Sequence, residues 1–331
     1  MRDVAKLAGV SQPTVSRVLN QSDTAIAISE ETRSKVLAAV EHLAYTPNML
    51  ARSLRTQQTQ MLAVLIADIS NSFYHPIARA IQDAAREYNY DVMIANSDHL
   101  YDNEKHFCEA VSRRPVDGVI MVPIHLTNDD LDDFLTRTNV PVAVLGQHVV
   151  HPHIDVVYVE DETATYDATR WLINEQGHIQ LGVIGVPDDM PPGPRRLHGF
   201  MDAVKDSQLT VHPEHVVFGD FTLESGRQAA QELLQCAQLP SAVVVLNDLM
   251  AIGAMLTLQE AGVRVPEDIA ILGYDDIPEA SIVRPALTTI AQDPVDIGRK
   301  LATCLFERIE QPDLPGSRIE SPAQFIKRDS A

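Results

Sequence analysis

A glycine turn between two short amphipathic stretches opens the chain and constrains the fold of its first 45 residues. Gly9 can adopt the left-handed backbone conformation that ends a helix. Ser11 stands where a hydroxyl caps the next helix, and Pro13 falls in its first turn, where the missing N–H costs little. Apolar side chains recur at helical spacing in both stretches, namely Val4, Leu7 and Ala8, then Val15, Val18 and Leu19. The pattern predicts a helix-turn-helix.

A third helix is expected to begin just after Ser29. Ser29 is a suitable N-cap, and Glu30 and Glu31 place negative charge at the positive end of the helix dipole. The apolar stripe of this helix is Val36, Leu37, Val40 and Leu43, and Pro47 marks its end. Three helices of this size predict one small core.

From Met61 onward, short apolar runs alternate with amphipathic stretches. Continuous apolar runs are typical of parallel strands covered on both faces, so the alternation predicts two βαβ domains with a break near residues 160–163. Ligands in such sheets bind outside the carboxyl ends of the strands, and a cleft between domains is a favoured site. The expected strands are 62–67, 91–95, 118–122, 140–145, 156–159, 181–186, 216–218, 242–246 and 269–273, with helices that include 76–88, 163–176 and 249–261.

The formal charge of −20 at pH 7 is unevenly distributed. Residues 1–60 hold seven Lys or Arg and five Asp or Glu, whereas the remainder holds 19 basic and 41 acidic side chains. An acidic body repels phosphate, so only the first segment is suited to contact nucleic acid. Its small surplus of positive charge predicts that two such segments act together.

Composition argues against several other classes of protein. No apolar run approaches the roughly 20 residues that span a bilayer, and no signal-peptide core follows the N-terminus, so we expect a cytoplasmic protein with no membrane partner. The three cysteines, at 108, 236 and 304, are distant and odd in number, which disfavours a disulfide framework or a structural zinc site. His148, His151 and His153 lie close together, but their spacing favours solvated loop histidines over a metal site.

Several strings of residues carry a family resemblance. They include Asp-Val-Ala-Lys-Leu-Ala-Gly-Val-Ser at 3–11, Pro-Asn-Met-Leu-Ala-Arg-Ser-Leu at 47–54, Arg-Leu-His-Gly-Phe at 196–200, Asn-Asp-Leu-Met-Ala-Ile-Gly at 247–253 and Gly-Tyr-Asp-Asp at 273–276. Their order and spacing resemble the lactose/galactose repressor family of bacterial transcriptional regulators over nearly the whole chain. The resemblance implies an all-α helix-turn-helix headpiece and an α/β, periplasmic-binding-protein-like body of two doubly wound parallel-sheet subdomains.

The resemblance also implies the domain boundaries. The headpiece would cover 1–46, the hinge helix and linker 47–60, and the effector-binding and dimerisation domain 61–331. Within that domain the N-subdomain would comprise about 61–160 and 292–320, and the C-subdomain about 162–289 and 322–331. Further crossings between the subdomains are implied near 289–293 and 320–322.

The second helix would then lie in the major groove of a pseudo-palindromic, double-stranded operator. Arg17 can make a bidentate contact with guanine and Gln12 can pair with adenine, whereas Pro13 can only pack. The positions expected to contact phosphate or to set the register are Ser11, Thr14, Ser16 and Asn20. The alternative for Ser11 and Ser16 is that they only cap and solvate their helix.

Residues 48–55 resemble the hinge helix of the family, and they are too few for a stable isolated helix in water. In the family, two hinge helices meet in the minor groove and each inserts a leucine, the position that Leu54 holds here. Arg52 and Arg55 would follow the phosphates, and Asn48 belongs to the same expected contacts. Without the preceding headpiece, Leu50 and Leu54 would be taken for an i, i+4 core pair.

The effector of the family lies between the subdomains, and seven positions match its pocket: Ser70, Phe73, Asp161, Arg196, Phe221, Asn247 and Asp275. Arg196 offers a planar fork of donors, and Asp275 accepts paired hydroxyls or ring N–H groups. Phe221 can cover the apolar face of a sugar or base. The alternatives are an interdomain ion pair for Arg196 and Asp275 and plain core for the two phenylalanines.

Two departures from the family pattern bear on the effector. The family usually has proline where Ser72 stands. The proline-rich segment 187–194 lacks the hydroxyl and cationic side chains that recognise purines in part of the family. A sugar or sugar derivative is therefore favoured, with a nucleoside or purine as the alternative.

Together these features predict a homodimeric, ligand-responsive regulator that represses genes of carbohydrate uptake or catabolism. No GxxxxGK[ST] or GxSxG motif is present, and neither a cofactor nor an enzymatic activity is expected. The alternatives are a sugar-binding module that does not bind an operator and a carbohydrate enzyme.

Overall fold

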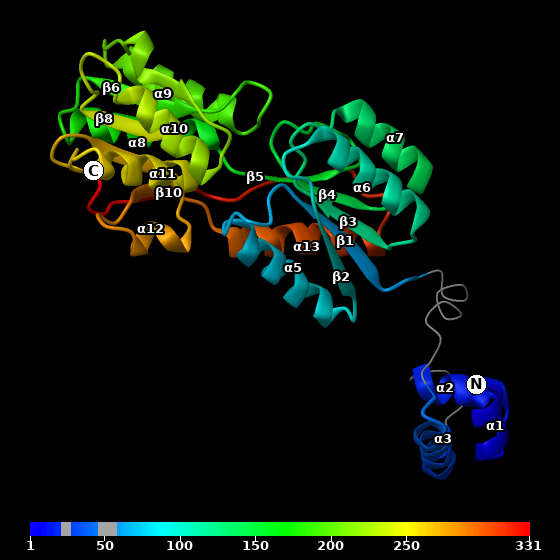
Figure 1. The fold of residues 1–331 in the computed structure, drawn as a ribbon. Helices are drawn as coiled ribbons and strands as arrows, with labels where there is room; N and C mark the ends of the chain where they lie inside the picture. Colours follow the sequence, from blue (N-terminus) through cyan, green and yellow to red (C-terminus); the bar gives the residue numbers. More distant parts are fainter. Residues whose placement is uncertain (21–27, 46–57) are drawn as a thin grey trace. The chain divides into compact units, whose positions relative to one another are not determined.

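The computed structural model describes residues 1–20, 28–45 and 58–331. The chain divides into two compact units, residues 1–59 and 60–331 (Figure 1). None of the helices in the described ranges combines the length and apolarity that a bilayer-spanning helix needs.

The first unit contains helices α1 (Arg2–Ala8), α2 (Gln12–Asn20) and α3 (Glu30–His42). Gly9 ends α1 in the left-handed conformation, with φ of 66°. The Ser11 hydroxyl accepts a hydrogen bond of 3.3 Å from the backbone N–H of Thr14, and Ser29 caps α3 in the same way. The predicted helix-turn-helix is confirmed.

The core of this unit is smaller than the sequence pattern indicated. Among the described residues of this unit, its buried members are Val4, Ala5, Val15, Val18, Val36 and Ala39. Leu7, Leu37 and Leu43 were expected to face inward, but they are 52%, 48% and 41% exposed. Successive residues lie about 100° apart around a helix axis. If the centre of the apolar face is placed one residue away from its true position, a leucine at the edge of that face is predicted to be buried in place of a neighbouring alanine.

The second unit begins with a six-stranded, wholly parallel sheet of order β11-β5-β4-β3-β1-β2. Its strands are β1 (Met61–Ile66), β2 (Asp91–Asn96), β3 (Gly118–Met121), β4 (Val142–Leu145), β5 (Asp155–Tyr158) and β11 (Arg318–Glu320). The accompanying helices are α5 (Tyr74–Glu87), α6 (Tyr101–Arg113), α7 (Asn128–Thr138) and α13 (Pro294–Glu310). Figure 1 shows α5 and α13 side by side on one face of this sheet.

A second six-stranded sheet has the order β12-β10-β9-β8-β6-β7, in which only β12 runs antiparallel to its neighbour. Its strands are β6 (Leu181–Gly185), β7 (Val216–Phe218), β8 (Ala242–Val245), β9 (Ala270–Asp275), β10 (Thr288–Ala291) and β12 (Gln324–Ile326). A short 3-10 helix (Pro213–His215) precedes β7, and the α-helices are α8 (Asp161–Asn174), α9 (Gly193–Asp206), α10 (Leu223–Leu233), α11 (Asp248–Glu260) and α12 (Pro278–Ile282).

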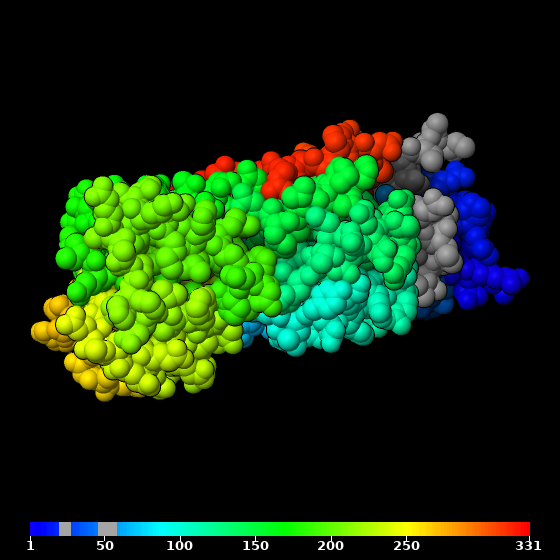
Figure 2. Space-filling view, turned by 90° about the horizontal axis from the view of Figure 1, so that it is seen from above, coloured from blue at the N-terminus to red at the C-terminus, as the bar shows by residue number. Residues whose placement is uncertain are grey.

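The fold class predicted from the sequence is confirmed, and the strands that were missed lie at the connections between the two sheets. The chain passes from one sheet to the other after β5, after β10 and again after β11. Residues near the C-terminus, red in Figure 2, consequently lie along both halves of the body. The missed strands are short and carry polar residues, with the sequences Thr-Thr-Ile-Ala in β10, Arg-Ile-Glu in β11 and Gln-Phe-Ile in β12, so none is a continuous apolar run.

A buried ion pair connects helix α13 to the first sheet. Arg308 on α13 donates to both carboxylate oxygens of Asp155 on β5, at 2.6 and 2.9 Å. Ser317 donates to Asp155 through its backbone N–H and its hydroxyl, and Arg308 also reaches the carbonyl oxygen of Leu314 at 2.7 Å. Asp155 and Arg308 are 3% and 4% exposed, so each charge relies on these partners rather than on water.

Replacing Arg308 by methionine should destabilise the body by about 3–5 kcal/mol, because it leaves a buried carboxylate without its cation. Urea titration of the full chain measures the loss. Arg227→Met is the matched control, since Arg227 is only half-buried and pairs at 2.7 Å with Glu260, which is exposed. The control should cost at most about 1 kcal/mol. Equal effects would show that the Asp155 carboxylate does not depend on Arg308.

Candidate functional site

The second helix presents one polar side and one apolar side. Val15 and Val18 are buried in the small core, whereas Gln12 and Pro13 are exposed and Arg17 is half-buried. This arrangement leaves Gln12, Pro13 and Arg17 available to base edges in a groove. The remaining predicted contacts are Ser11, which is exposed and caps the helix, Thr14, which is half-buried, Ser16, which is 8% exposed, and Asn20, the last residue of α2. The predicted hinge contacts Asn48, Arg52, Leu54 and Arg55 lie outside the described residues.

Six of the seven residues predicted to bind an effector line one pocket between the two sheets: Phe73, Asp161, Arg196, Phe221, Asn247 and Asp275. Each follows or ends a strand, or lies near the start of a helix, at the edge where the carboxyl ends of the parallel strands meet. Ser70 is the exception, because it is exposed, lies outside the lining and donates its hydroxyl to Asp68 at 2.7 Å.

Arg196 is the centre of the charge network in this pocket. Its Nε donates to Oδ1 of Asp161 at 2.9 Å, and its Nη1 donates to the carbonyl oxygen of Leu246 at 2.6 Å. The same Nη1 lies 3.6 Å from Oδ1 of Asp275, and the guanidinium stacks 3.6 Å above the ring of Tyr274. Burial alone would lower the pKa of Arg196, but Asp161, Tyr274 and Asp275 raise it above its usual value. The guanidinium therefore stays protonated.

Asp275 is held in an unusual backbone conformation at the end of β9. Its φ is 118°, a value that L-residues rarely adopt, and such strain persists where the surroundings fix the conformation. Gln292, just after the second crossing, donates to the Asp275 carboxylate at 2.7 Å. Burial raises the pKa of Asp275 to about 7, although Arg196 opposes the rise. The carboxyl can therefore accept hydrogen bonds when ionised and donate one when protonated.

Further hydrogen bonds hold the loops that carry the pocket residues. The Asn247 side chain caps α11 by accepting from the N–H of Met250 at 2.9 Å, and it donates to the carbonyl oxygen of Phe221 at 2.8 Å. Fully buried Asp248 accepts from the hydroxyl of Thr289 and from the N–H of Ile277. Burial raises the pKa of Asp248 well above its usual range. These bonds fix the loops that carry Asn247 and Asp275.

Aromatic rings from both subdomains enclose the polar centre. Phe73 and Tyr74 meet edge to face with ring centroids 5.2 Å apart. His99 from the first subdomain meets Phe221 from the second at 6.0 Å. Phe221 also has a positive φ of 70°. Pro191 and Pro192, from the proline-rich segment before Arg196, complete this part of the lining.

Gln147, His148 and Arg195 are among the lining residues that were not predicted from the sequence. Within the part of the chain that the structure describes, four buried polar atoms of these side chains have no hydrogen-bond partner: Oε1 of Gln147, Nδ1 and Nε2 of His148, and Nε of Arg195. Buried polar groups are ordinarily paired, so unpaired atoms on side chains that line a pocket indicate a place for a polar ligand. The signal in the sequence was the position of Gln147 and His148 just after β4, at the same sheet edge as Phe73, and the position of Arg195 next to Arg196.

The interpretation of the loop histidines as solvated is wrong for two of the three. His148 lines the pocket, and burial, reinforced by the charge of Arg195, lowers the pKa of its imidazole to about 4. The His151 side chain is 4% exposed and lies 2.8 Å from Asp132. Only His153 is exposed. The loop folds back against the sheet, which residue spacing alone does not reveal.

Ser72, at the position where proline was expected, connects the two subdomains. Its hydroxyl donates to Oε2 of Glu279, on α12, at 2.7 Å. Proline could not make this bond, since it has no side-chain donor. The substitution therefore adds a polar link between the loop after β1 and the opposite subdomain.

Comparison with known proteins agrees with this architecture. The sequence profile of bacterial regulatory proteins of the lacI family matches residues 1–48, and that of a periplasmic binding protein-like domain matches residues 169–331. Catabolite control protein A of Priestia megaterium is 33% identical over 329 residues, which cover 99% of this chain and 98% of the relative. This chain belongs to the lacI family of bacterial regulatory proteins.

Solved structures of other regulators extend the similarity to three dimensions. The lac repressor dimer bound to operator and the anti-inducer ONPF has a TM-score of 0.87 at 30% identity, and the match covers 99% of this chain and 97% of that one. A complex of the transcriptional regulator CelR with cellobiose has a TM-score of 0.75 at 30% identity, with coverage of 99% and 98%. The chain is thus a lacI-family transcriptional regulator with a DNA-binding helix-turn-helix and an effector-binding body.

The raised pKa of Asp275 predicts a pH dependence of stability with a definite sign. The folded protein keeps the proton up to about pH 7, whereas the unfolded chain releases it near pH 4. The free energy of unfolding should therefore fall as the pH rises through this window. Asp275→Asn cannot titrate, so urea titrations should show wild type losing stability relative to the variant between pH 5 and 8.

Asp268→Asn is the control for this experiment. The Arg264 side chain, through a hydrogen bond and an ion pair, lowers the pKa of Asp268 to about 2, so both folded and unfolded forms are ionised above pH 5. The stability difference between wild type and Asp268→Asn should stay constant from pH 5 to 8. A constant difference for Asp275→Asn as well would contradict the raised pKa.

Proposed function

We propose that this lacI-family regulator is a homodimeric repressor of carbohydrate uptake or catabolism genes, controlled by a small neutral sugar. The observation that carries the proposal is the combination of two features in one chain. One is a capped helix that leaves Gln12, Pro13 and Arg17 accessible above a buried valine face. The other is a pocket between two subdomains whose polar atoms are only partly paired.

Operator recognition rests on α2. Arg17 reads guanine, a contact worth about 1–3 kcal/mol of discrimination, and Gln12 reads adenine. The family resemblance alone supports the proposed minor-groove and phosphate contacts of Asn48, Arg52, Leu54 and Arg55. The small positive surplus of one headpiece favours paired headpieces on a pseudo-palindrome. The lac repressor, which is similar over 99% of this chain, binds its operator as a dimer.

A neutral, hydroxyl-rich effector fits the charges of the pocket. Arg195 and Arg196 face Asp161 and Asp275, so no cation is left uncompensated for a phosphate. The unpaired atoms include the acceptor Oε1 of Gln147, the donor Nε of Arg195 and a neutral imidazole. Hydroxyl groups both donate and accept, so they can satisfy all of these atoms.

Aromatic rings support the same class of ligand. Phe73 and Phe221 can cover the apolar faces of a pyranose or furanose ring, while Asp275 accepts from paired hydroxyls. The cellobiose complex of CelR is an example of a sugar bound by a protein of similar fold. A nucleoside is the second candidate, since Asp275 can also accept from ring N–H groups.

Control of DNA binding would follow from a shift between two arrangements of the subdomains. A ligand that contacts residues of both subdomains favours the arrangement in which all the contacts form. The shift is limited by the difference between its affinities for the two arrangements. Because its target is the bacterial operator, we place the regulator in the cytoplasm, and we propose no catalytic role for the pocket.

Sequencing of genomic fragments retained by the purified protein tests the DNA function. Wild type should enrich a few pseudo-palindromes, either alone or with a pooled mixture of sugars and nucleosides. Arg17→Ala should lose this enrichment by tenfold or more, because it removes base readout. Lys35→Ala is the control, because like Arg17→Ala it removes one positive charge from the headpiece. Lys35 pairs with Glu31 on α3 at 2.7 Å, so this variant should enrich the same DNA motif as wild type. Failure of wild type to enrich any motif under both conditions would contradict the proposal.

A thermal-shift screen of neutral sugars, sugar phosphates and nucleosides tests the effector. A neutral sugar should raise the unfolding temperature and remain chemically unchanged after overnight incubation. His148→Leu should weaken its binding about tenfold or more, because the imidazole is one of its partners. His153→Ala, an exposed histidine of the same loop, should bind normally. Preference for a nucleoside, or equal losses in both variants, would contradict the proposed ligand or the role of His148.

A further inference from the structure

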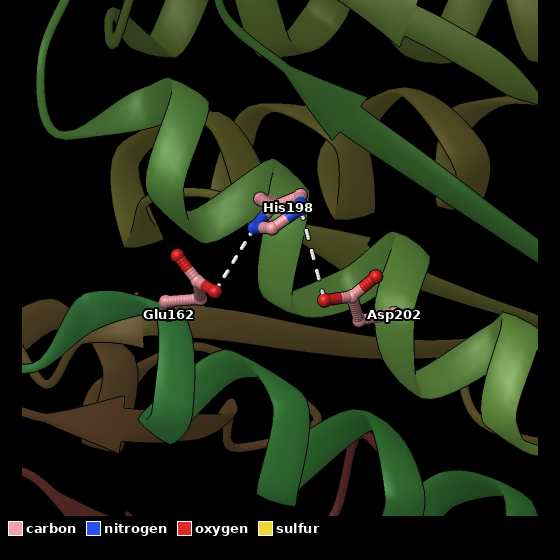
Figure 3. Close-up of side chains that lie close together, drawn as sticks. All are labelled: Glu162, His198 and Asp202. Atoms are coloured by element: carbon pink, nitrogen blue, oxygen red, sulfur yellow. Dashed lines mark ion pairs between the residues drawn. The ribbon is translucent and has the colours of Figure 1, made fainter.

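Outside the effector pocket, three side chains of the types that bind metal ions converge where α8 meets α9. They are Glu162 on α8 and His198 and Asp202 on α9 (Figure 3). Nδ1 of His198 lies 2.9 Å from Oε1 of Glu162, and Nε2 lies 3.7 Å from Oδ2 of Asp202. One potential ligand atom from each residue lies within 4.8 Å of the other two, and no other group of this kind occurs among the described residues.

We propose that Glu162, His198 and Asp202 form a surface site for a divalent transition-metal ion of the zinc type. Zinc binds imidazole nitrogen and carboxylate oxygen at about 2.0–2.2 Å, so ligand atoms around one ion stand about 3 Å apart. The His198–Glu162 separation of 2.9 Å already matches this spacing. A mixed nitrogen and oxygen set suits Zn²⁺ better than Ca²⁺ or Mg²⁺, which prefer oxygen alone.

The spacing of the ligands along α9 supports the same site. His198 and Asp202 are four residues apart and therefore share one face of the helix, as do the two histidines of helical zinc motifs. In the structure Asp202 faces the second ring nitrogen of His198, and its side chain is 40% exposed. Binding of one ion through Nδ1 of His198 would require the Asp202 side chain, which is 40% exposed, to turn toward that nitrogen. Water molecules would complete the coordination.

The two helices provide a rigid platform for these ligands. Gly199, next to His198, permits their close approach, because a Cβ atom at this position would lie 2.1 Å from the carbonyl oxygen of Glu162. Further along the same contact, the Tyr166 hydroxyl donates to Asp206 at 3.1 Å and Arg170 donates to Ser207 at 2.8 Å. The distance between the two helices that carry Glu162 and His198 is therefore fixed by backbone packing, so an ion would have to order only the side chains.

Charge also favours a dication at this place. Among the ion pairs of the described residues, Glu162 and Asp202 pair with His198 and with no lysine or arginine. One imidazole supplies at most one positive charge against two carboxylates. The rest of the body adds to the deficit, since residues 61–331 hold 41 acidic and 19 basic side chains.

An ion at this site would join the two helices that build the base of the effector pocket. Glu162 directly follows Asp161, and His198 lies two residues after Arg196. A metal bridge would thus restrain the pair in which Arg196 donates to Asp161. Binding of the ion itself does not depend on which effector, if any, enters the pocket, so the two proposals can fail separately.

Isothermal titration of the metal-stripped full chain with ZnCl₂ tests the site. Wild type should show one site that is tighter than the background from its 12 histidines. Its affinity should fall by tenfold or more in His198→Ala and in the isosteric Glu162→Gln. His212→Ala is the matched control, because His212 is an equally exposed histidine that faces a single carboxylate, Glu214, at 3.8 Å. This variant should retain the tight site.

Thermal unfolding provides a second readout and checks that the variants fold. Zn²⁺ should raise the unfolding midpoint of wild type and of His212→Ala but not that of His198→Ala. Absence of a tight site in wild type, or equal losses in the His198 and His212 variants, would overturn the proposal. Displacement of Zn²⁺ by equimolar Mg²⁺ would also overturn it, because the trio would then be only an acidic surface.

Discussion

A permanent positive charge in the interior determines how the rest of the effector pocket is arranged. Arg196 is 4% exposed, and its guanidinium cannot lose its proton at any ordinary pH. Burial of such a group is tolerable only if its donors are engaged and its charge is balanced, and Asp161, Asp275 and the carbonyl oxygen of Leu246 do this. The partners are drawn from the ends of separate elements, so one side chain fixes the positions of several loops.

Two of those partners lie at or beside the connections between the subdomains. Asp161 begins α8 directly after the first crossing, and Asp275 accepts from Gln292 at the second. A ligand that competes for these carboxylates would act on the segments that join the two halves, where the proposed shift between arrangements would take place. The link between Ser72 and Glu279 adds a contact between the subdomains outside the pocket. Recognition of a ligand and movement of the subdomains therefore involve the same few hydrogen bonds.

Features that depend on local periodicity were predicted correctly from the sequence. Features that depend on contacts between residues distant in the chain were not. Uninterrupted apolar runs identified nine strands, and the match to family strings identified Arg196 and Asp275. Leu7 and Leu37 were placed in the core because periodicity locates a helical face only to within a residue. His148 was taken for a solvated residue because nothing local shows that its loop turns back over the carboxyl end of β4. Strands β11 and β12 were missed because each joins its sheet only after the chain has crossed from the other sheet, which local sequence does not show.

The three crossings have a consequence for the order in which the protein can be completed on the ribosome. The described members of the headpiece core end at Tyr45 and the unit itself ends at residue 59, so it can fold while most of the chain is still untranslated. Each sheet of the body, in contrast, lacks an edge strand until residues 318–326 have emerged. Neither half of the body can therefore mature ahead of the other. A nascent chain would carry a finished DNA-recognition module long before it acquires the part that controls it.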